Sequence, residues 1–336
     1  MTSTDARPAT ATPTAVRTRA YREGRLVAEG FPLAEASDHL ATDGCVLWID
    51  LVDPRAEDVE ALGDELGFHE LAVEDALQDG QRSKLDRYPD HLFVALYDAG
   101  FDAASGEVRT SEVKALVTHR ALVTIHHPDV DAAVLTARWD GSAELAGHGV
   151  SWLLWGLLDL VADRQQDCAD ALDDALEALA DDLFDPAPRG LDVQKRSFAL
   201  RQGLVRLRRV SGPMRELVGS LLRQDLAAVQ GELRPWFEDV EDHVLRVAGQ
   251  TDALRDLVQT ILDTDLNLRS VRMNEVMKKV TSWAAIIAVP TAVTGFYGQN
   301  VPYPGAGETS GFVVSSVLVV GGAAALWLAF RRRDWL

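Results

Sequence analysis

The chain has 336 residues, 47% of them hydrophobic, and a mean hydropathy of −0.04. This composition provides a buried core but excludes a protein built mainly of membrane spans. The formal net charge of −19 argues against nucleic acid as a partner and would concentrate cations around the chain, although a bias towards Ala and Asp that keeps the protein soluble explains it equally well. Cys45 and Cys168 lie far apart, which indicates a reduced compartment without disulfides.

Residues 1–19 are expected to form a disordered tail. Residues 1–16 are rich in Thr, Ala and Pro and contain no apolar run, so we expect no signal peptide.

Residues 20–149 predict a cytoplasmic α/β domain. Apolar or alternating runs predict strands at 45–52, 91–101, 107–118 and 121–126. Asp53-Pro54 opens a helix, and 69–78 predicts a second one. His126-His127 ends a strand without a visible nucleophile or a carboxylate at metal-ligand spacing, so we interpret it as a turn and expect no enzyme.

Residues 150–233 predict a helical hairpin that packs on a stalk. The pattern over 151–184 becomes strongly acidic, and residues 195–209 are basic, so the two helices would pair through opposite charges. Pro186 is expected to end the first helix, and Gly212-Pro213 to kink the second. A metal-loading role for the acidic face is the alternative.

Residues 234–301 predict one long stalk helix that continues into a first transmembrane helix. Residues 280–297 and 312–330 are uncharged and approach the roughly 20 residues that span a bilayer. They flank a polar loop at 302–311, and residues 331–336 form a basic tail. Lys278, Lys279 and Arg331 to Arg333 flank the spans, so both termini of this multi-pass plasma-membrane protein are expected in the cytoplasm, with lipid as a partner.

Two helices cannot enclose a pore, so conduction would require several copies around one axis. Heptad-like spacing along the membrane end of the stalk selects a stripe of small and polar positions, which either packs against another helix or lines a narrow pore. The stripe consists of Asn274, Met277, Thr281, Ala284, Ala288, Thr291 and Gly295. Pro290 leaves the carbonyl of Ile286 without its helical donor, which is best tolerated near water or another polar group.

Three segments resemble the CorA family of magnesium and cobalt transporters. Asn274-Glu275-Val276-Met277-Lys278 is followed, after a proline-containing helix, by Tyr297-Gly298-Gln299-Asn300, which is similar to the family's Tyr-Gly-Met-Asn signature. Residues 69–84 (HELAVEDALQDGQRSK) and 237–243 (FEDVEDH) resemble the family's cytoplasmic segment and the start of its stalk. The resemblance covers all but about the first twenty residues.

The resemblance implies an α+β cytoplasmic domain followed by long helices and two C-terminal transmembrane helices, in a funnel-shaped homopentamer. It implies Mg²⁺ and Co²⁺ uptake, with Mg²⁺ both transported and regulatory and with no organic cofactor. Gly298, Gln299 and Asn300 would form the selectivity filter, Asn274 and Thr291 polar pore rings, and Met277 with Val280 an apolar constriction. Asp75 and Asp239 would hold a regulatory cation between neighbouring subunits.

Gln299 replaces the signature Met and leaves ion selectivity open. Amide and carbonyl rings suit hydrated Mg²⁺, whereas Zn²⁺ favours His or Cys, and no histidine lies in the membrane helices or their loop. Zinc transport by a relative of the same family remains an alternative, as does a membrane-tethered scaffold that conducts nothing.

Overall fold

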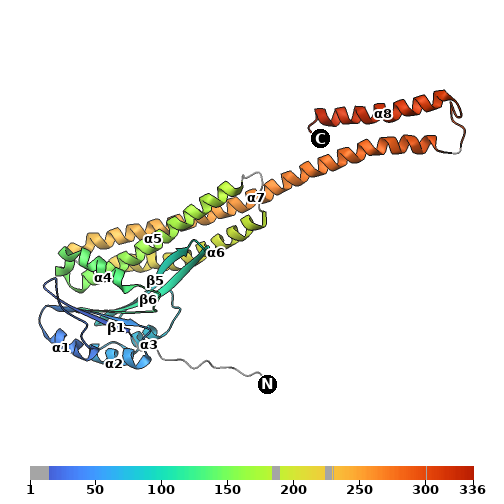
Figure 1. The fold of residues 1–336 in the computed structure, drawn as a ribbon. Coiled ribbons are helices and arrows are strands. Elements are labelled where there is room, and N and C mark those ends of the chain that lie inside the picture. Colours follow the sequence, from blue (N-terminus) through green and yellow to red (C-terminus); the bar gives the residue numbers. More distant parts are fainter. Residues whose placement is uncertain (1–14, 184–189, 224–228, 230, 300) are drawn as a thin grey trace, which may run out of the picture. The chain divides into compact units, whose positions relative to one another are not determined.

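The computed structural model describes residues 15–183, 190–223, 229, 231–299 and 301–336 (Figure 1). The chain forms two compact units, Met1–Gln259 and Thr260–Leu336. The first unit contains a seven-stranded sheet and helices on both of its faces. The second contains two long apolar helix segments and the loop that joins them.

The sheet has the strand order β2-β1-β3-β7-β6-β5-β4. Neighbouring strands are antiparallel except for β3 and β7, which are parallel. The predicted strands appear as β3 (Cys45–Val52), β5 (His91–Asp102), β6 (Glu107–Thr118) and β7 (Ala121–His126). The sheet is completed by three strands that the sequence analysis did not identify, β1 (Ala15–Arg22), β2 (Arg25–Glu29) and β4 (Lys84–Arg87).

The expected disordered tail over residues 1–19 was wrong for its last five residues. Residues 15–19 begin β1, which pairs with β3 along its whole length. The apolar alternation of this strand is weak in the sequence, because buried Thr18 is polar and Arg19, although its side chain is largely covered, is charged and pairs with Glu29 and Asp140. The rest of the predicted tail, residues 1–14, lies outside the described residues.

One face of the sheet is covered by η1 (Leu33–Glu35), α1 (Ala36–Ala41), α2 (Ala56–Leu66) and α3 (Glu70–Leu77). Gly67 ends α2 in the left-handed region at φ 73°. A Cβ on Gly63 of α2 would come within 2.8 Å of Val73 of α3, so this glycine allows the two helices to pack closely. Helix α3 carries Asp75.

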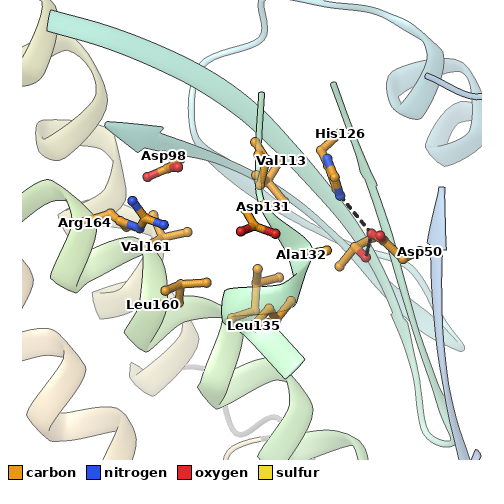
Figure 2. A pocket seen from close by; sticks show the side chains of 13 residues that line it. Asp50, Asp98, Val113, His126, Asp131, Ala132, Leu135, Leu160, Val161 and Arg164 are labelled. Atoms are coloured by element: carbon orange, nitrogen blue, oxygen red, sulfur yellow. Dashed lines mark hydrogen bonds and ion pairs between the residues drawn. The ribbon is translucent and has the colours of Figure 1, made fainter. Parts of the chain in front are cut away.

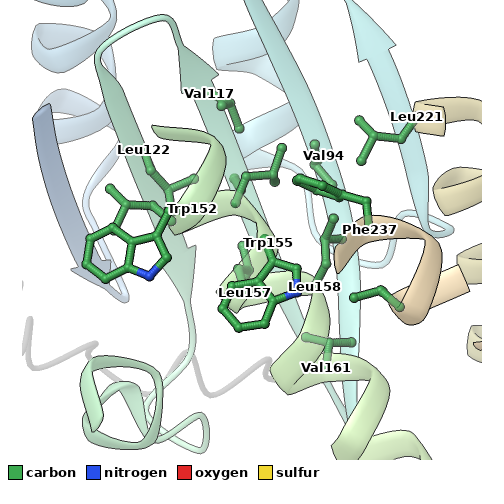
Figure 3. Close-up of a cluster of buried hydrophobic side chains, with 14 of the residues drawn as sticks. Val94, Val117, Leu122, Trp152, Trp155, Leu157, Leu158, Val161, Leu221 and Phe237 are labelled. Carbon is green, nitrogen blue, oxygen red and sulfur yellow. The ribbon is translucent and has the colours of Figure 1, made fainter. Parts of the chain in front are cut away.

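The other face is covered by α4 (Ala132–Gly141), η2 (Ala143–His148), α5 (Val150–Leu183) and α6 (Gly190–Arg223), with η4 (Gly231–Leu233) and the start of α7. Figure 3 shows their shared core, in which Phe237 and Leu221 lie near Val94 of the sheet and Trp152 lies beside Leu122. The predicted division at residues 149 and 233 is therefore not a structural one. The hairpin and the α/β region form a single unit, because the apolar face of α5 is buried against the sheet.

The basic residues of α6 have varied partners. Arg196 forms an ion pair with Asp182 of α5, as expected, whereas Arg206 donates to the carbonyl of Val108 in β6 at 3.1 Å and Arg208 pairs with Asp252 of α7 at 2.8 Å. The helix continues through Pro213. Helix α7 spans Arg234–Tyr297, and near its start Trp236 meets Trp155 of α5 edge-on at 5.4 Å between ring centroids.

Helix α8 (Thr309–Arg332) follows α7 after a short loop. Both helices are long and apolar enough to cross a membrane, and only 6% of the apolar window of α7 and 0% of that of α8 are buried. The core helix of a soluble protein would be mostly buried. Their exposure therefore favours membrane helices.

Candidate functional site

The predicted pore stripe lies on an uncovered face of α7. Its positions are all exposed in the single chain: Asn274, Met277, Val280, Thr281, Ala284, Ala288, Thr291 and Gly295. The less exposed positions follow a different line along the helix: Ser282, Ala285, Ile286, Val289, Pro290, Val293 and Tyr297. At 3.6 residues per turn the two lines lie about 180° apart around the helix axis.

Helix α8 packs against this second line. A Cβ on Gly322 of α8 would come within 2.9 Å of the side chain of Val289. The glycine thus permits the close approach that is typical of membrane helices. Packing within the chain therefore occupies one face of α7 and leaves the small and polar stripe free for another partner or for water.

The polar groups of this stripe are partly used within the helix. The hydroxyl of Thr291 donates to the carbonyl of Ile287 at 3.0 Å, and that of Thr294, a neighbour outside the stripe, to the carbonyl of Pro290 at 2.8 Å. Their oxygens retain acceptor capacity towards water or a hydrated ion.

The loop between α7 and α8 is held by aromatic rings and glycines. Tyr303 lies edge-on to Tyr297 at 5.0 Å between centroids. A Cβ on Gly311 would overlap the carbonyl of Gly305, so a glycine at 311 allows the start of α8 to lie this close to the loop backbone. The amide of Gly298 donates to the carbonyl of Thr294 at 2.9 Å, and that of Gln299 to Phe296 at 3.3 Å. Gly298 and Gln299 are exposed, and Asn300 lies outside the described residues.

Asp75, the first predicted regulatory acid, is already hydrogen-bonded. Its Oδ2 accepts from Nζ of Lys84 at 2.6 Å, and its Oδ1 from Nε2 of Gln81 at 3.1 Å. Burial lowers the pKa of Lys84, but hydrogen bonds to Asp75 and Asp86 outweigh burial, so the net shift is upward. Lys84 is therefore a cation at neutral pH.

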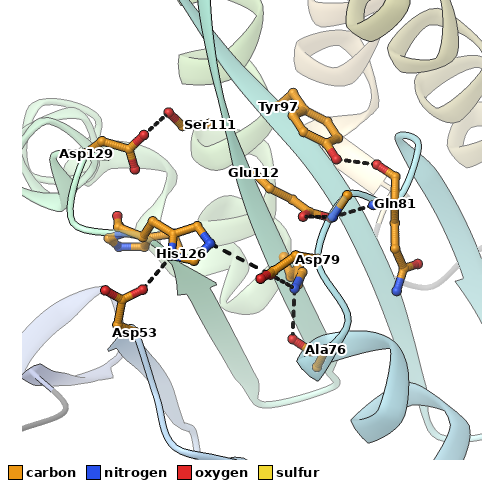
Figure 4. Close-up of polar contacts among 12 residues, drawn as sticks. Asp53, Ala76, Asp79, Gln81, Tyr97, Ser111, Glu112, His126 and Asp129 are labelled. Atoms are coloured by element: carbon orange, nitrogen blue, oxygen red, sulfur yellow. Dashed lines mark hydrogen bonds and ion pairs between the residues drawn. The ribbon is translucent and has the colours of Figure 1, made fainter. Parts of the chain in front are cut away.

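The loop after α3 is fixed by groups on β6. Glu112 accepts from the amides of Gly80 and Gln81 at 2.8 and 3.3 Å, and Lys114 contacts Asp79 at 3.0 Å. Figure 4 shows Glu112, Gln81 and Asp79 within one polar network. The anchored loop positions the Gln81 side chain against Asp75.

Asp239, the second predicted regulatory acid, is exposed on α7. Its Oδ2 lies 3.8 Å from Nε2 of His243, whose Nδ1 lies 3.7 Å from Asp163 of α5. Ligand atoms of Asp159, Asp163 and His243 lie within 4.8 Å of one another, a spacing that could hold a metal. The guanidinium of Arg138 contacts both Asp159 and Asp163 and already neutralises much of their charge.

The structure does not bring Asp75 and Asp239 together in one chain. Asp75 lies on α3, which covers one face of the sheet, whereas Asp239 lies near the start of α7, which packs on the other face. A cation held by both acids would therefore require a second subunit.

Sequence reasoning missed a buried polar group between the sheet and helices α4 and α5. Figure 2 shows Asp50 and His126 at one side of a cavity of about 20 Å³, with Asp98 and Arg164 at the other. The Nε2 of His126 lies 3.0 Å from Oδ1 of Asp50, and its Nδ1 lies 2.7 Å from the carbonyl of His127. His126 was interpreted as part of a turn; it is instead the buried last residue of β7.

Two carboxylate oxygens of residues that line this cavity, Oδ2 of Asp50 and Oδ1 of Asp98, have no hydrogen-bond partner among the described residues, and Nε2 of His126 has only the ion-pair contact with Asp50. The volume suits a single water, which could donate to both carboxylate oxygens. Burial raises the pKa of Asp98, and the charge of Arg164 opposes that shift. The cluster of Asp50 and His126 could be recognised only once the pairing of β3 with β7 was known.

Comparisons with known proteins agree with the fold. A family model described as CorA-like Mg2+ transporter protein matches residues 43–332. The chain is 28% identical over 295 residues to the cobalt/magnesium transport protein CorA of Thermotoga maritima, covering 86% of this chain and 83% of that protein. It is 23% identical over 310 residues to the zinc transport protein ZntB of Yersinia pseudotuberculosis, covering 88% and 89%. The structure of the CorA magnesium transporter from Methanocaldococcus jannaschii shares the fold, with a TM-score of 0.78, 23% identity and coverage of 96% and 98%.

Proposed function

The chain belongs to the family of CorA-like Mg2+ transporter proteins, and on this basis we propose that it mediates uptake of Mg²⁺ and Co²⁺ across the plasma membrane as a homopentamer. The family is one of transporters. The two apolar helices, exposed in the single chain, support membrane localisation. The flanking basic residues support an arrangement with both termini in the cytoplasm.

The observation that carries the proposal is the uncovered stripe on α7. Because α8 packs on the opposite face, α7 can present Asn274, Thr291 and Gly295 to a shared axis without losing its intrachain packing. Five copies arranged in this way would line a narrow path with small and polar groups. Met277 and Val280 would form its apolar constriction.

In this proposal, Gly298, Gln299 and Asn300 form the entrance filter. Amide and carbonyl oxygens can contact a Mg²⁺ ion through its water shell, which that ion gives up reluctantly. Gln299, in place of Met, adds an exposed amide to the filter. The likeness to a zinc transport protein makes Zn²⁺ the second candidate ion.

Asp75 and Asp239 supply the regulatory part of the proposal. A divalent cation between two acids of neighbouring subunits would remove their repulsion and stabilise the closed assembly. Loss of the cation would loosen the assembly and open the pore. Cytoplasmic Mg²⁺ would thereby limit its own uptake.

The deciding experiment is flux into liposomes that contain the purified protein. We expect entry of Mg²⁺ and Co²⁺ to exceed entry of Zn²⁺, and Asn300→Ala to abolish entry while the oligomer elutes unchanged in gel filtration. Dominant Zn²⁺ flux would favour the zinc alternative. Absence of any flux would favour a scaffold. Retained Mg²⁺ flux in Asn300→Ala would show that Asn300 is not a filter residue.

A further inference from the structure

Asp75 is paired with an internal cation before any metal arrives. The ammonium of Lys84 lies 2.6 Å from Oδ2 of Asp75 and 2.8 Å from Oδ2 of Asp86. The side chains of Lys84 and Asp75 are only 28% and 24% exposed, so water screens this pair less than it screens a pair on the open surface.

The position of the ammonium is fixed by its surroundings. Lys84 belongs to β4, opposite Ala95 of β5, and its Nζ lies 5.2 Å from the centre of the Phe93 ring. Gln81 holds the other Asp75 oxygen and also donates to the Asp75 carbonyl at 2.7 Å. Both carboxylate oxygens of Asp75 therefore have donors within the same chain.

We propose that Lys84 is a tethered counter-ion that competes with the regulatory divalent cation for Asp75 and so sets the concentration at which that cation acts. This inference rests on the proposed regulatory role of Asp75. A divalent cation at Asp75 repels the ammonium and must displace it from Oδ2. Asp86, 40% exposed and already in contact, is the carboxylate to which Lys84 can retreat.

The test measures the internal Mg²⁺ concentration that halves uptake into proteoliposomes made with the full-length protein. Lys84→Met keeps the length of the side chain and removes its charge, so we expect that concentration to fall about fivefold or more. Lys84→Arg keeps the charge and should stay near the parent. Arg82→Gln is the matched control, because Arg82 lies two residues away and pairs with the exposed Glu216 rather than with Asp75.

A second variant moves the response in the opposite direction. Asp86→Asn removes the alternative partner of Lys84, so we expect half-inhibition to require more Mg²⁺ than in the parent. Part of that shift would come from the lost negative charge itself. The shift should therefore be smaller when Asp86→Asn is introduced into Lys84→Met, and an equal shift in both backgrounds would contradict the competition.

The outcomes separate this inference from the function on which it rests. If Asp75→Asn abolishes inhibition while Lys84→Met and Asp86→Asn both match the parent, Asp75 is regulatory and Lys84 does not compete. If Asp75→Asn is inhibited like the parent, the regulatory role of Asp75 itself is wrong. Should Lys84→Met fail to assemble, Asp86→Asn alone decides, since unchanged inhibition in that variant overturns the proposal.

Discussion

His126 is a buried titratable residue inside the first unit. Both of its ring nitrogens face acceptors, the Asp50 carboxylate and the His127 carbonyl. Thr124 donates to the same Asp50 oxygen at 2.6 Å, and Trp48 donates in turn to Thr124 at 3.0 Å. Removal of one partner from such a buried pair leaves the other charge uncompensated, which costs about 3–5 kcal/mol.

The His126 pair predicts a pH-dependent stability. Burial lowers the pKa of His126, but the hydrogen bond and the charge of Asp50 outweigh it and the net shift is upward. The stabilisation is therefore complete below the unfolded pKa of about 6.5 and is lost as the pH rises through the folded pKa. His126→Gln should lower the melting temperature by roughly 6–12 °C near pH 6 and by much less near pH 8.5.

Differential scanning fluorimetry of the full-length protein across this range checks the prediction. His119→Gln serves as the control, because His119 is exposed in the turn between β6 and β7. A gap between parent and His126→Gln that stays constant with pH would show that His126 is neutral in the fold.

At the scale of elements, the contact of α8 with α7 depends on one glycine. Gly322 faces Val289, whereas a Cβ on its neighbour Gly321 would meet no atom within 4 Å. Gly322→Val should therefore separate the two helices and lower the yield of assembled protein by severalfold. Gly321→Val is the matched control and should assemble normally in gel filtration; equal losses in both variants would show that any added bulk on α8 is harmful.

The two faces of α7 make a second prediction. Cys45 and Cys168 are the two native cysteines, and both are buried. In a background in which both are replaced by alanine, an introduced cysteine is the only thiol that can be labelled. Thr291→Cys should react with a small water-soluble thiol reagent if the stripe lines a pore, while Val289→Cys, on the α8 side, should react at least tenfold more slowly. Similar labelling rates at the two positions, measured by mass spectrometry, would indicate that the stripe packs against another helix and does not line a pore.

The elements that sequence reasoning identified are those with strong apolar patterns. Strands β3, β6 and β7 match the predicted bounds, because most residues of β3 and β7 and of the second half of β6 are buried. Strand β1 escaped notice because arginines and Thr18 interrupt its apolar pattern, and the short edge strand β2 is exposed almost throughout. The apolar face of α5 was visible in the sequence, but its partner was not, so the sheet and the hairpin were assigned to separate domains.

Some residues of the candidate site could likewise be predicted from the sequence, and others could not. The stripe on α7 follows from helical spacing and needs no knowledge of tertiary structure. The Asp50–His126 pair does need it, because its members lie on strands that are far apart in the sequence and only the parallel register, with Asp50 opposite Thr124, brings them together. The pairing of Lys84 with Asp75 likewise depends on β4, which the sequence did not predict.

At the scale of the whole molecule, the net charge of −19 opposes assembly of several copies unless cations reduce the repulsion. Asp239 is 62% exposed in the single chain and is therefore accessible to a cation that another subunit helps to bind. The proposed assembly would thus depend on divalent ions through specific acids rather than through general screening alone.

Asp239→Asn tests this dependence. We expect the variant to lose most of the protection that Mg²⁺ gives the first unit against proteolysis, and to continue uptake at internal Mg²⁺ levels that silence the parent. Glu238→Gln, which removes the neighbouring charge that pairs with Arg234, is the control. Full protection in both variants, measured by the rate of loss of the intact band, would mean that other groups hold the closed state.

The edge-on contact of Trp155 with Trp236 gives the protein an intrinsic optical reporter. Trp236 is 41% exposed and precedes Asp239 by three residues, about one turn of α7, whereas Trp155 is buried in α5. Indole emission depends on local polarity and on neighbouring rings, so a small shift of α7 against α5 changes the fluorescence without any attached dye. Titration of Mg²⁺ into the unlabelled protein, with Trp236→Phe as the blank, can thus follow events beside Asp239 in real time.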